Sequence, residues 1–128
     1  PQPVLLFMHH PFFPIGIPSM DAISLRDTAA FMAAIDGHEH RIRQVFFGHI
    51  HRPICGVFRG MPYSTLRGTN HQVALDLGGD AQVIVGAHEP PQYGVVLLSP
   101  DQVLIHAEDY LDAGGRYLLH EMHPQQAA

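Results

Sequence analysis

Histidines follow directly after two apolar runs of this 128-residue chain, a placement that suits metal chemistry. They are His9 and His10 after the first run, and His49 and His51 after the second. Neutral imidazole is the commonest side-chain ligand for zinc, manganese, iron or cobalt. Gly48 predicts a sharp backbone turn that lets the two later rings point into one cleft. The pattern therefore indicates a metal site.

Two strands and a helix must bring these histidines together. The continuous apolar runs Val4–Met8 and Gln44–Phe47 are typical of buried strands. Apolar positions between them predict a helix that begins at an N-cap, Ser24, and ends near Asp36 before Gly37. A connection of about 35 residues suits a crossover between parallel strands. Both histidine groups would then lie at the carboxyl edge of one sheet, where ligand sites of open α/β sheets form.

The rest of the chain has short apolar runs separated by turn residues, which is typical of β-structure. The expected strands are Ile54–Arg59, Tyr63–Leu66, His71–Leu77, Gln82–Val85, Tyr93–Leu98 and Val103–His106. We expect a turn at Gly60-Met61-Pro62, a connection at Gly78-Gly79-Asp80 and a hairpin around Ser99-Pro100-Asp101. A β-α-β unit followed mostly by strands predicts an α/β fold with a β-rich C-terminal extension.

Composition and charge exclude several other functions. Hydrophobic residues make up 46% of the chain, which is enough for a core. The net charge is −5 and all seven basic residues are Arg, so we expect neither a nucleic-acid polymer nor a membrane as a partner. The single Cys55 excludes an internal disulfide, and we expect it to be a buried core thiol. With no signal peptide visible, this cysteine usage is compatible with the cytoplasm.

The two histidine motifs resemble those of a known family. Leu6-Phe7-Met8-His9-His10-Pro11 and Phe46-Phe47-Gly48-His49-Ile50-His51 are similar to the last two metal motifs of calcineurin-like metallophosphoesterases. The likeness is closer to class III cyclic nucleotide phosphodiesterases and bacterial glycerophosphodiesterases, because Met20-Asp21 and the segment 66–73 (LRGTNHQV) resemble that subgroup as well. The resemblance covers residues 4 to about 77.

This resemblance implies a binuclear centre of two ions among Mn, Fe, Zn and Co. His9 and His49 would bind one metal, His51 would bind the other, and His71 would approach the substrate phosphate. The implied reaction is hydrolysis of a small phosphodiester, such as a cyclic nucleotide or a glycerophosphodiester, by attack of a metal-bound hydroxide on phosphorus. The resemblance gives His10 no ligand role.

The family fold is a four-layer α-β-β-α sandwich, of which this chain would be one part. Residues 1–72 would form the C-terminal lobe of the catalytic domain, and residues 73–128 a β-rich cap that contributes to oligomer contacts. The family also needs an Asp-x-His, a bridging Asp and a Gly-Asn-His-Asp/Glu motif before His-His-Pro, and none occurs in this sequence. We therefore expect a C-terminal fragment that binds metal weakly, is inactive alone and self-associates as a homo-oligomer.

Plainer interpretations stay open for several of these side chains. His49 and His51 could be solvated residues of a polar turn, and His10 could be purely structural. Asp21 could pin its loop by accepting hydrogen bonds from the backbone. Two arginines could either meet the substrate phosphate or be paired with carboxylates; they are Arg52 and Arg67.

Two other classes of protein are alternatives to the phosphodiesterase. A mononuclear metal protein of the cupin type also uses His-x-His, but it needs a Glu a few residues later, and the next Glu after His51 is Glu89. A non-enzymatic β-rich oligomerisation or interaction module would instead use residues 73–128, whose apolar strands could pair across a symmetric interface.

Overall fold

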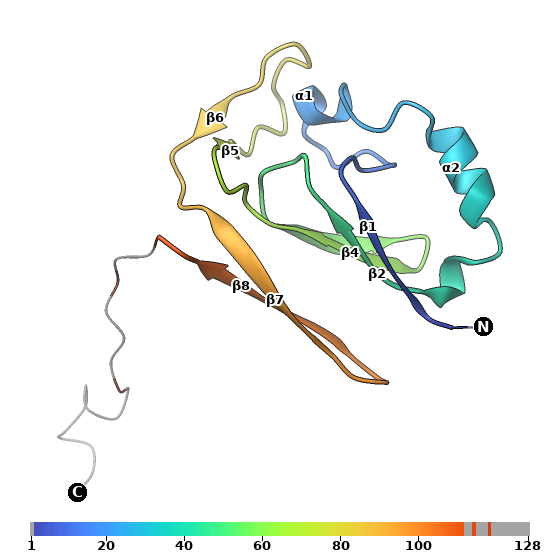
Figure 1. The fold of residues 1–128 in the computed structure, drawn as a ribbon. Coiled ribbons are helices and arrows are strands. Elements are labelled where there is room, and N and C mark those ends of the chain that lie inside the picture. Colours follow the sequence, from blue (N-terminus) through green and yellow to red (C-terminus); the bar gives the residue numbers. More distant parts are fainter. Residues whose placement is uncertain (1, 112–113, 115–117, 119–128) are drawn as a thin grey trace, which may run out of the picture.

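A four-stranded mixed sheet organises the computed structural model, which describes residues 2–111, 114 and 118 (Figure 1). Its strands are β1 (Val4–Met8), β2 (Ile42–Phe47), β3 (Ile54–Phe58) and β4 (Met61–Thr65). They lie in the order β1-β2-β4-β3, with β1, β2 and β4 parallel and β3 antiparallel to β4. The parallel pairing of β1 with β2 across a helical connection confirms the predicted β-α-β unit.

One face of this sheet carries the hydrophobic core. Phe12 and Phe13 come from the loop after β1 and pack against inward side chains of β2 and β4, chiefly Val45, Phe47 and Met61. The apolar face of helix α2 (Thr28–Ile35) closes this layer through Phe31, Met32 and Ile35. The phenylalanine rings of this core pack against one another in stacked, tilted and edge-on pairs.

Helix α2 begins later than the sequence predicts. Asp27 is its N-cap and accepts a hydrogen bond from the backbone N–H of Ala30 at 3.1 Å, so the prediction of Ser24 as the cap is wrong. Asp, like Ser, is a strong N-cap former, and Asp27 lies three residues further along the chain. Gly37 follows the helix with φ +73°, the left-handed conformation expected of a helix stop. The other helical segments are short: α1 (Pro18–Asp21) and η1 (Glu39–Arg41).

The turn between β3 and β4 begins one residue earlier and ends two residues earlier than predicted. Arg59 and Gly60 form it, with φ +48° and +81°, the left-handed pair of a tight two-residue hairpin. Met61 and Pro62 therefore belong to β4 rather than to the turn. β3 is an edge strand whose residues alternate inward and outward, so Cys55 is exposed and the prediction of a buried thiol is wrong.

Two small antiparallel ribbons follow the main sheet. The strand predicted over His71–Leu77 shortens to β5 (Gln72–Val73), and its partner is β6 (Gly86–Ala87) rather than Gln82–Val85. The predicted final hairpin is confirmed as β7 (Gln92–Leu98) and β8 (Val103–Asp109). The predicted extension over residues 73–128 is described as far as Leu111 and at residues 114 and 118, and the rest of it lies outside the described residues.

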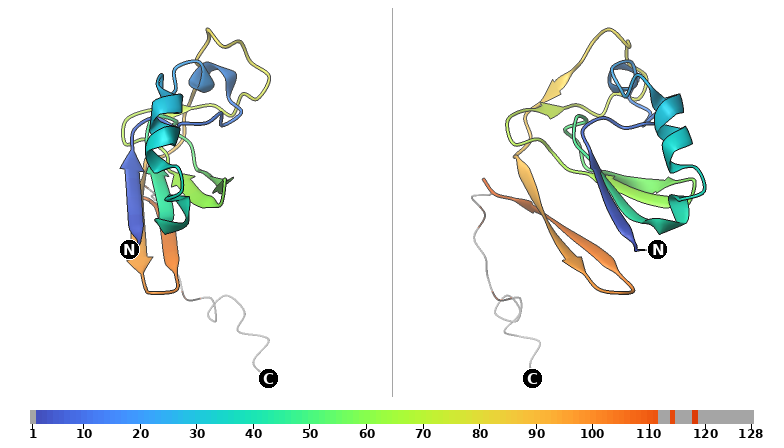
Figure 2. Two further views of the ribbon diagram at one scale, coloured as in Figure 1. Left: turned by 90° about the vertical axis from the view of Figure 1, so that its right-hand side faces the viewer. Right: turned by 45° about the vertical axis from the view of Figure 1, so that its right-hand side comes forward.

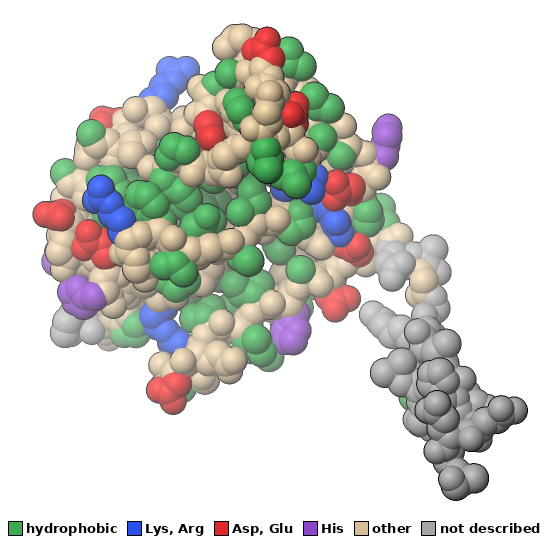
Figure 3. All heavy atoms as spheres, turned by 180° about the vertical axis from the view of Figure 1, so that it is seen from behind, with side chains coloured by type: hydrophobic (Ala, Val, Ile, Leu, Met, Phe, Trp, Pro, Cys, Tyr) green, Lys and Arg blue, Asp and Glu red, His purple; other side chains and the backbone are tan. Residues whose placement is uncertain are grey.

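The β7–β8 hairpin lies across from α2, on the other side of the main sheet (Figures 1 and 2). Arg43 of β2 donates a hydrogen bond to the Ser99 carbonyl at the hairpin tip, at 2.7 Å. Seen from behind, hydrophobic side chains gather in and around the hollow between sheet and hairpin (Figure 3). Phe7, on this side of β1, remains 70% exposed and stacks on Phe46 with ring centroids 4.7 Å apart.

These sheets and few helices agree with the predicted α/β class. Among the described residues, no helix has the length and apolar character that crossing a membrane requires.

The N-cap assignment can be tested by comparing two substitutions. We expect Asp27→Ala to lower the free energy of unfolding by about 1 kcal/mol, because the N–H of Ala30 loses its acceptor. Ser24→Ala should leave stability almost unchanged. Urea denaturation followed by circular dichroism measures both, and a larger loss in the Ser24 variant would contradict the assignment.

Candidate metal centre

The carboxyl ends of β1 and β2 bring three histidines into one cluster. Nitrogen atoms of His9, His10 and His49 all lie within 4.8 Å of one another. The ring centroids of His9 and His49 are 5.3 Å apart, and the His10 ring lies 4.4 Å from that of His49. The structure therefore brings the two histidine groups together at one edge of the sheet, as predicted. His10, to which the family resemblance assigns no ligand role, is part of the same cluster.

Strained backbone presents the histidines after β2. His49 and His51 have φ of +62° and +53°, a region that few residues other than glycine adopt, although His does so more readily than most. The N–H of Ile50 bonds to the Gly48 carbonyl at 2.6 Å, which makes His49 the centre of a γ-turn. The side chain of Ile50 is fully buried and anchors this turn. Such strain persists only where the surrounding structure over-determines it, as at ligand sites.

Gly48 serves a different purpose from the one predicted. Its own φ is not positive, so the sharp turn is made by the histidines that follow it. A Cβ at this position would lie 3.0 Å from Nδ1 of His9, closer than such contacts normally are. Gly48 therefore gives the His9 ring room to approach β2.

His49 is held as a neutral imidazole. Burial is the main cause that lowers its pKa to about 4, and the nearby His10, His9 and His51 lower it further, while a backbone hydrogen bond at Ile23 opposes the shift. Its Nε2 is buried and has no hydrogen-bond partner. A neutral ring with a buried, unpaired nitrogen is the state in which histidine binds a metal. The residues present thus fit a metal ion.

His51 lines the same pocket. The pocket has a volume of about 430 Å³, and its lining includes His9, His49 and His51. Nδ1 of His51 is 2.7 Å from the His71 carbonyl oxygen, and the two rings lie in a tilted arrangement with centroids 4.3 Å apart. The His71 side chain itself is exposed and belongs to the lining of a neighbouring pocket, which Asn70 and His88 also line.

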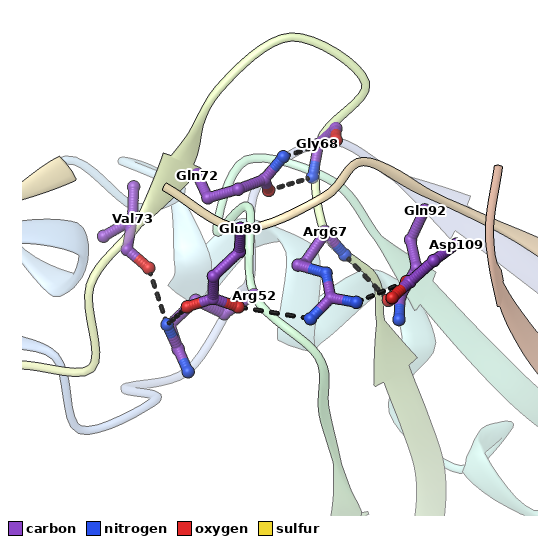
Figure 4. Close-up of polar contacts among 8 residues, drawn as sticks. All are labelled: Arg52, Arg67, Gly68, Gln72, Val73, Glu89, Gln92 and Asp109. Carbon is purple, nitrogen blue, oxygen red and sulfur yellow. Dashed lines mark hydrogen bonds and ion pairs between the residues drawn. The ribbon is translucent and has the colours of Figure 1, made fainter. Parts of the chain in front are cut away.

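Two carboxylates that sequence reasoning did not single out bind the arginines beside the pocket (Figure 4). Glu89 accepts hydrogen bonds from Arg52 at 2.9 Å and from Arg67 at 3.2 Å, and Asp109 pairs with Arg67. The bond from Arg52 is the main reason why the pKa of Glu89 lies below its ordinary value, and Arg67 lowers the pKa of Asp109 in the same way. Both arginines are thus paired, as the plainer interpretation has it. Because the partners lie 22 to 42 residues away in sequence, no local pattern reveals them.

Asp21 has the structural role that the sequence allowed. Its carboxylate accepts hydrogen bonds from the backbone N–H groups of Ile15 at 2.7 Å and of Gly16 at 3.0 Å. These bonds close the loop after β1, where Gly16 has φ +87°. Asp21 therefore supports the segment that carries His9 and His10 without lining the pocket.

The chain is similar to several phosphodiesterases. It is 41% identical over 120 residues to a probable cyclic nucleotide phosphodiesterase of Rhodopseudomonas palustris, a match that covers 94% of this chain and 43% of the relative. It is 32% identical over 108 residues to a probable glycerophosphodiester phosphodiesterase of Arcobacter nitrofigilis, covering 84% of this chain and 39% of the relative. A glycerophosphodiester phosphodiesterase of Enterobacter lignolyticus is 33% identical over 72 residues, covering 56% and 26%. No family model matches the chain.

The chain spans about two fifths of the length of the first two of these relatives. Both relatives are named as phosphodiesterases and are therefore hydrolases.

The lowered pKa of His49 predicts how stability depends on pH in the metal-free chain. In the unfolded chain His49 takes up a proton as the pH falls below about 6.5, whereas in the folded chain it does so only near pH 4. The unfolded state thus binds more protons between these values, and stability should fall as the pH is lowered from 6.5 to 4. Urea denaturation in the presence of a chelator measures this dependence.

A matched pair of variants isolates the contribution of this residue. His49→Asn should flatten the pH dependence across that window, while His38→Asn, at an exposed position, should retain it. An unchanged slope in the His49 variant would show that another group is responsible.

Proposed function

The chain belongs to the metallophosphoesterase family, as its phosphodiesterase relatives do, and from this premise we propose that it supplies metal ligands for the hydrolysis of small phosphodiesters. The observation that carries the proposal is the buried, unpaired Nε2 of His49, which lies in a cluster with His9 at the edge of the sheet. A solvated polar turn would leave this nitrogen bonded to water, whereas a metal site needs it free and neutral.

We assign His9 and His49 to one ion and His51 to a second. The close approach of the first two rings supports this division, and His51 lines the same pocket. The imidazole set suits Mn, Fe, Zn or Co. Two such ions, when bound, lower the pKa of a water molecule and stabilise the phosphoryl oxygens.

The chain's own residues would bind and orient the substrate. A volume of about 430 Å³ is in the range of small-molecule sites and suits a cyclic nucleotide or a glycerophosphodiester. Phe46 and Val96 contribute apolar side chains to the pocket lining, and Thr69 and Asn70 contribute polar ones. His71, next to Asn70 and with its ring 4.3 Å from that of His51, is the residue that we propose to contact the phosphate.

Three imidazoles provide fewer ligands than two metal ions require. Among the described residues, none of the carboxylates lines the pocket. Since the chain spans about two fifths of its relatives, we propose that the remaining ligands belong to a longer protein. In this proposal residues 1–72 are one lobe of the catalytic domain, and the exposed face around Phe7 packs against a further sheet, which would complete the four-layer sandwich. The chain alone would then bind metal weakly and be inactive.

The hairpin supports a second candidate function, that of an oligomerisation module. Residues 94, 96 and 105 face the pocket, so the other side of the hairpin faces outward. That outward side exposes the apolar side chains of Tyr93, Val95, Leu97 and Leu104, next to the polar His106 and Glu108. Contiguous exposed apolar surface often marks an interface. We propose that two copies of the chain associate through this side, whether or not the metal centre is complete.

Metal titration tests the ligand assignment. We expect calorimetry with Mn²⁺ to show weak binding to the wild-type chain, and substitution of His9, His49 or His51 by Ala to weaken it further. His40→Ala, at an exposed position of η1 just before β2 begins, is the control. Binding that survives His49→Ala unchanged would contradict the proposed site.

A chromogenic phosphodiester should show no turnover by the chain alone, and efficient turnover together with two tightly bound ions would contradict the incomplete centre.

Light scattering coupled to size-exclusion chromatography tests the oligomerisation proposal. We expect a mass above that of a monomer for the wild type and a shift toward monomer for Leu97→Glu, because a charge would be buried in the interface. Leu77→Glu places the same charge on an exposed loop residue away from the hairpin and should leave the mass unchanged. A strictly monomeric wild-type chain would rule out this function.

A further inference from the structure

The ring of His51 is oriented by a loop that is distant in sequence, residues 68–72. The His51 backbone has φ +53°, a conformation that few residues other than glycine adopt. The ring is fixed by the contact of Nδ1 with the His71 carbonyl at 2.7 Å. A carbonyl oxygen only accepts hydrogen bonds, so Nδ1 must carry the proton and donate it. The remaining nitrogen, Nε2, is then left with its lone pair available.

The loop that supplies this carbonyl is closed by one buried amide. Gln72 is 3% exposed, and its side chain bonds twice to Gly68 at the start of the loop (Figure 4). Its Nε2 donates to the Gly68 carbonyl at 2.8 Å, and its Oε1 accepts from the Gly68 N–H at 2.7 Å. The amide thus pairs with the polar groups of a single residue and ties the two ends of residues 68–72 together.

Gly68 is packed directly against the ring that the loop orients. A Cβ at this position would lie 2.6 Å from Nδ1 of His51 and 2.8 Å from the His71 carbonyl oxygen, distances that real Cβ atoms do not show. The bonds from Gln72 therefore hold the loop backbone in contact with the imidazole. Loss of these bonds would free both the surface that supports the ring and the carbonyl that accepts from it.

Neighbouring bonds fix Gln72 itself. Arg52, next to His51 in sequence, donates to the Val73 carbonyl at 2.9 Å, just beyond Gln72 (Figure 4). β5 pairs with β6 through Gln72 and Ala87. The Gln72 backbone is thus held by its neighbours on both sides. His51 bonds to the carbonyl of residue 71, and Arg52 bonds to the carbonyl of residue 73.

We propose that Gln72 is a positioning residue for His51: by closing residues 68–72 it holds the His71 carbonyl against Nδ1 and so selects the tautomer that leaves Nε2 free to bind a metal. The consequence for metal binding rests on the proposed function, whereas the tautomer does not. Outer groups that orient a metal-binding histidine typically contribute about 10- to 100-fold to metal affinity or activity.

The imidazole ¹⁵N spectrum of the metal-free chain tests the tautomer directly. At about pH 8, where an ordinary imidazole is neutral, we expect wild-type His51 to be almost entirely protonated at Nδ1. Gln72→Met keeps the buried volume but removes both bonds, and should convert His51 to a mixture of tautomers while leaving His9 and His49 unchanged. Gln82→Met makes the same change at an exposed position and is the control.

Two further variants keep the test decisive. Should Gln72→Met fail to fold, Gln72→Glu retains the acceptor for the Gly68 N–H and should give an intermediate mixture. His71→Ala removes the imidazole that contacts the His51 ring but keeps the backbone carbonyl, so it should preserve the wild-type tautomer of His51. An unchanged His51 spectrum in both Gln72 variants, or a mixture in wild type, would overturn the proposal.

Mn²⁺ affinity then separates this inference from the function on which it builds. If both proposals hold, Gln72→Met weakens Mn²⁺ binding about 10- to 100-fold and His51→Ala weakens it at least as much. If Gln72→Met changes the tautomer while neither variant affects binding, Gln72 positions His51 as proposed, but His51 is not a ligand.

Discussion

The parallel register of β1 with β2 is the constraint on which the site depends. Met8 lies opposite Phe47, so both strands end at the same level. The Gly48 N–H donates to the Met8 carbonyl at 3.1 Å and continues the ladder one residue further. His9 directly follows β1, and His49 follows β2 after Gly48, so the two rings lie close to each other. Because side chains alternate between faces, a slip of one residue would move one ring out of this cluster.

Backbone groups help to orient the proposed ligands that follow β2. His51 bonds to the carbonyl of residue 71, and Nε2 of His49 has no hydrogen-bond partner, so each ring keeps one nitrogen for a ligand. Both residues have positive φ on either side of the buried Ile50. The packing of the Ile50 side chain and the hydrogen bond from the His51 ring to the loop at residue 71 offset the energetic cost of this strained backbone.

The main sheet has two unequal faces, and their difference matters for function. α2 and two phenylalanines cover one face densely, while the other borders the pocket and leaves Phe7 largely exposed. The ion pairs of Arg67 with Glu89 and Asp109 tie the β7–β8 hairpin to the rim of that second face. The hairpin can therefore form one wall of the pocket while its outer side remains free for another chain.

Local sequence patterns determined the strands Val4–Met8 and Gln44–Phe47, the final hairpin and the histidines at the strand ends, because these features depend on short apolar runs and turn residues. The β-α-β pairing that joins the two histidine groups followed from the same patterns.

Only the tertiary structure decided which residues meet across long stretches of chain. It placed His10 in the cluster, exposed Cys55 on an edge strand and paired Glu89 with two arginines. It also showed that Gly48 makes room for a ring rather than making a turn. Each of these depends on contacts between segments far apart in sequence, whose energies no local periodicity encodes.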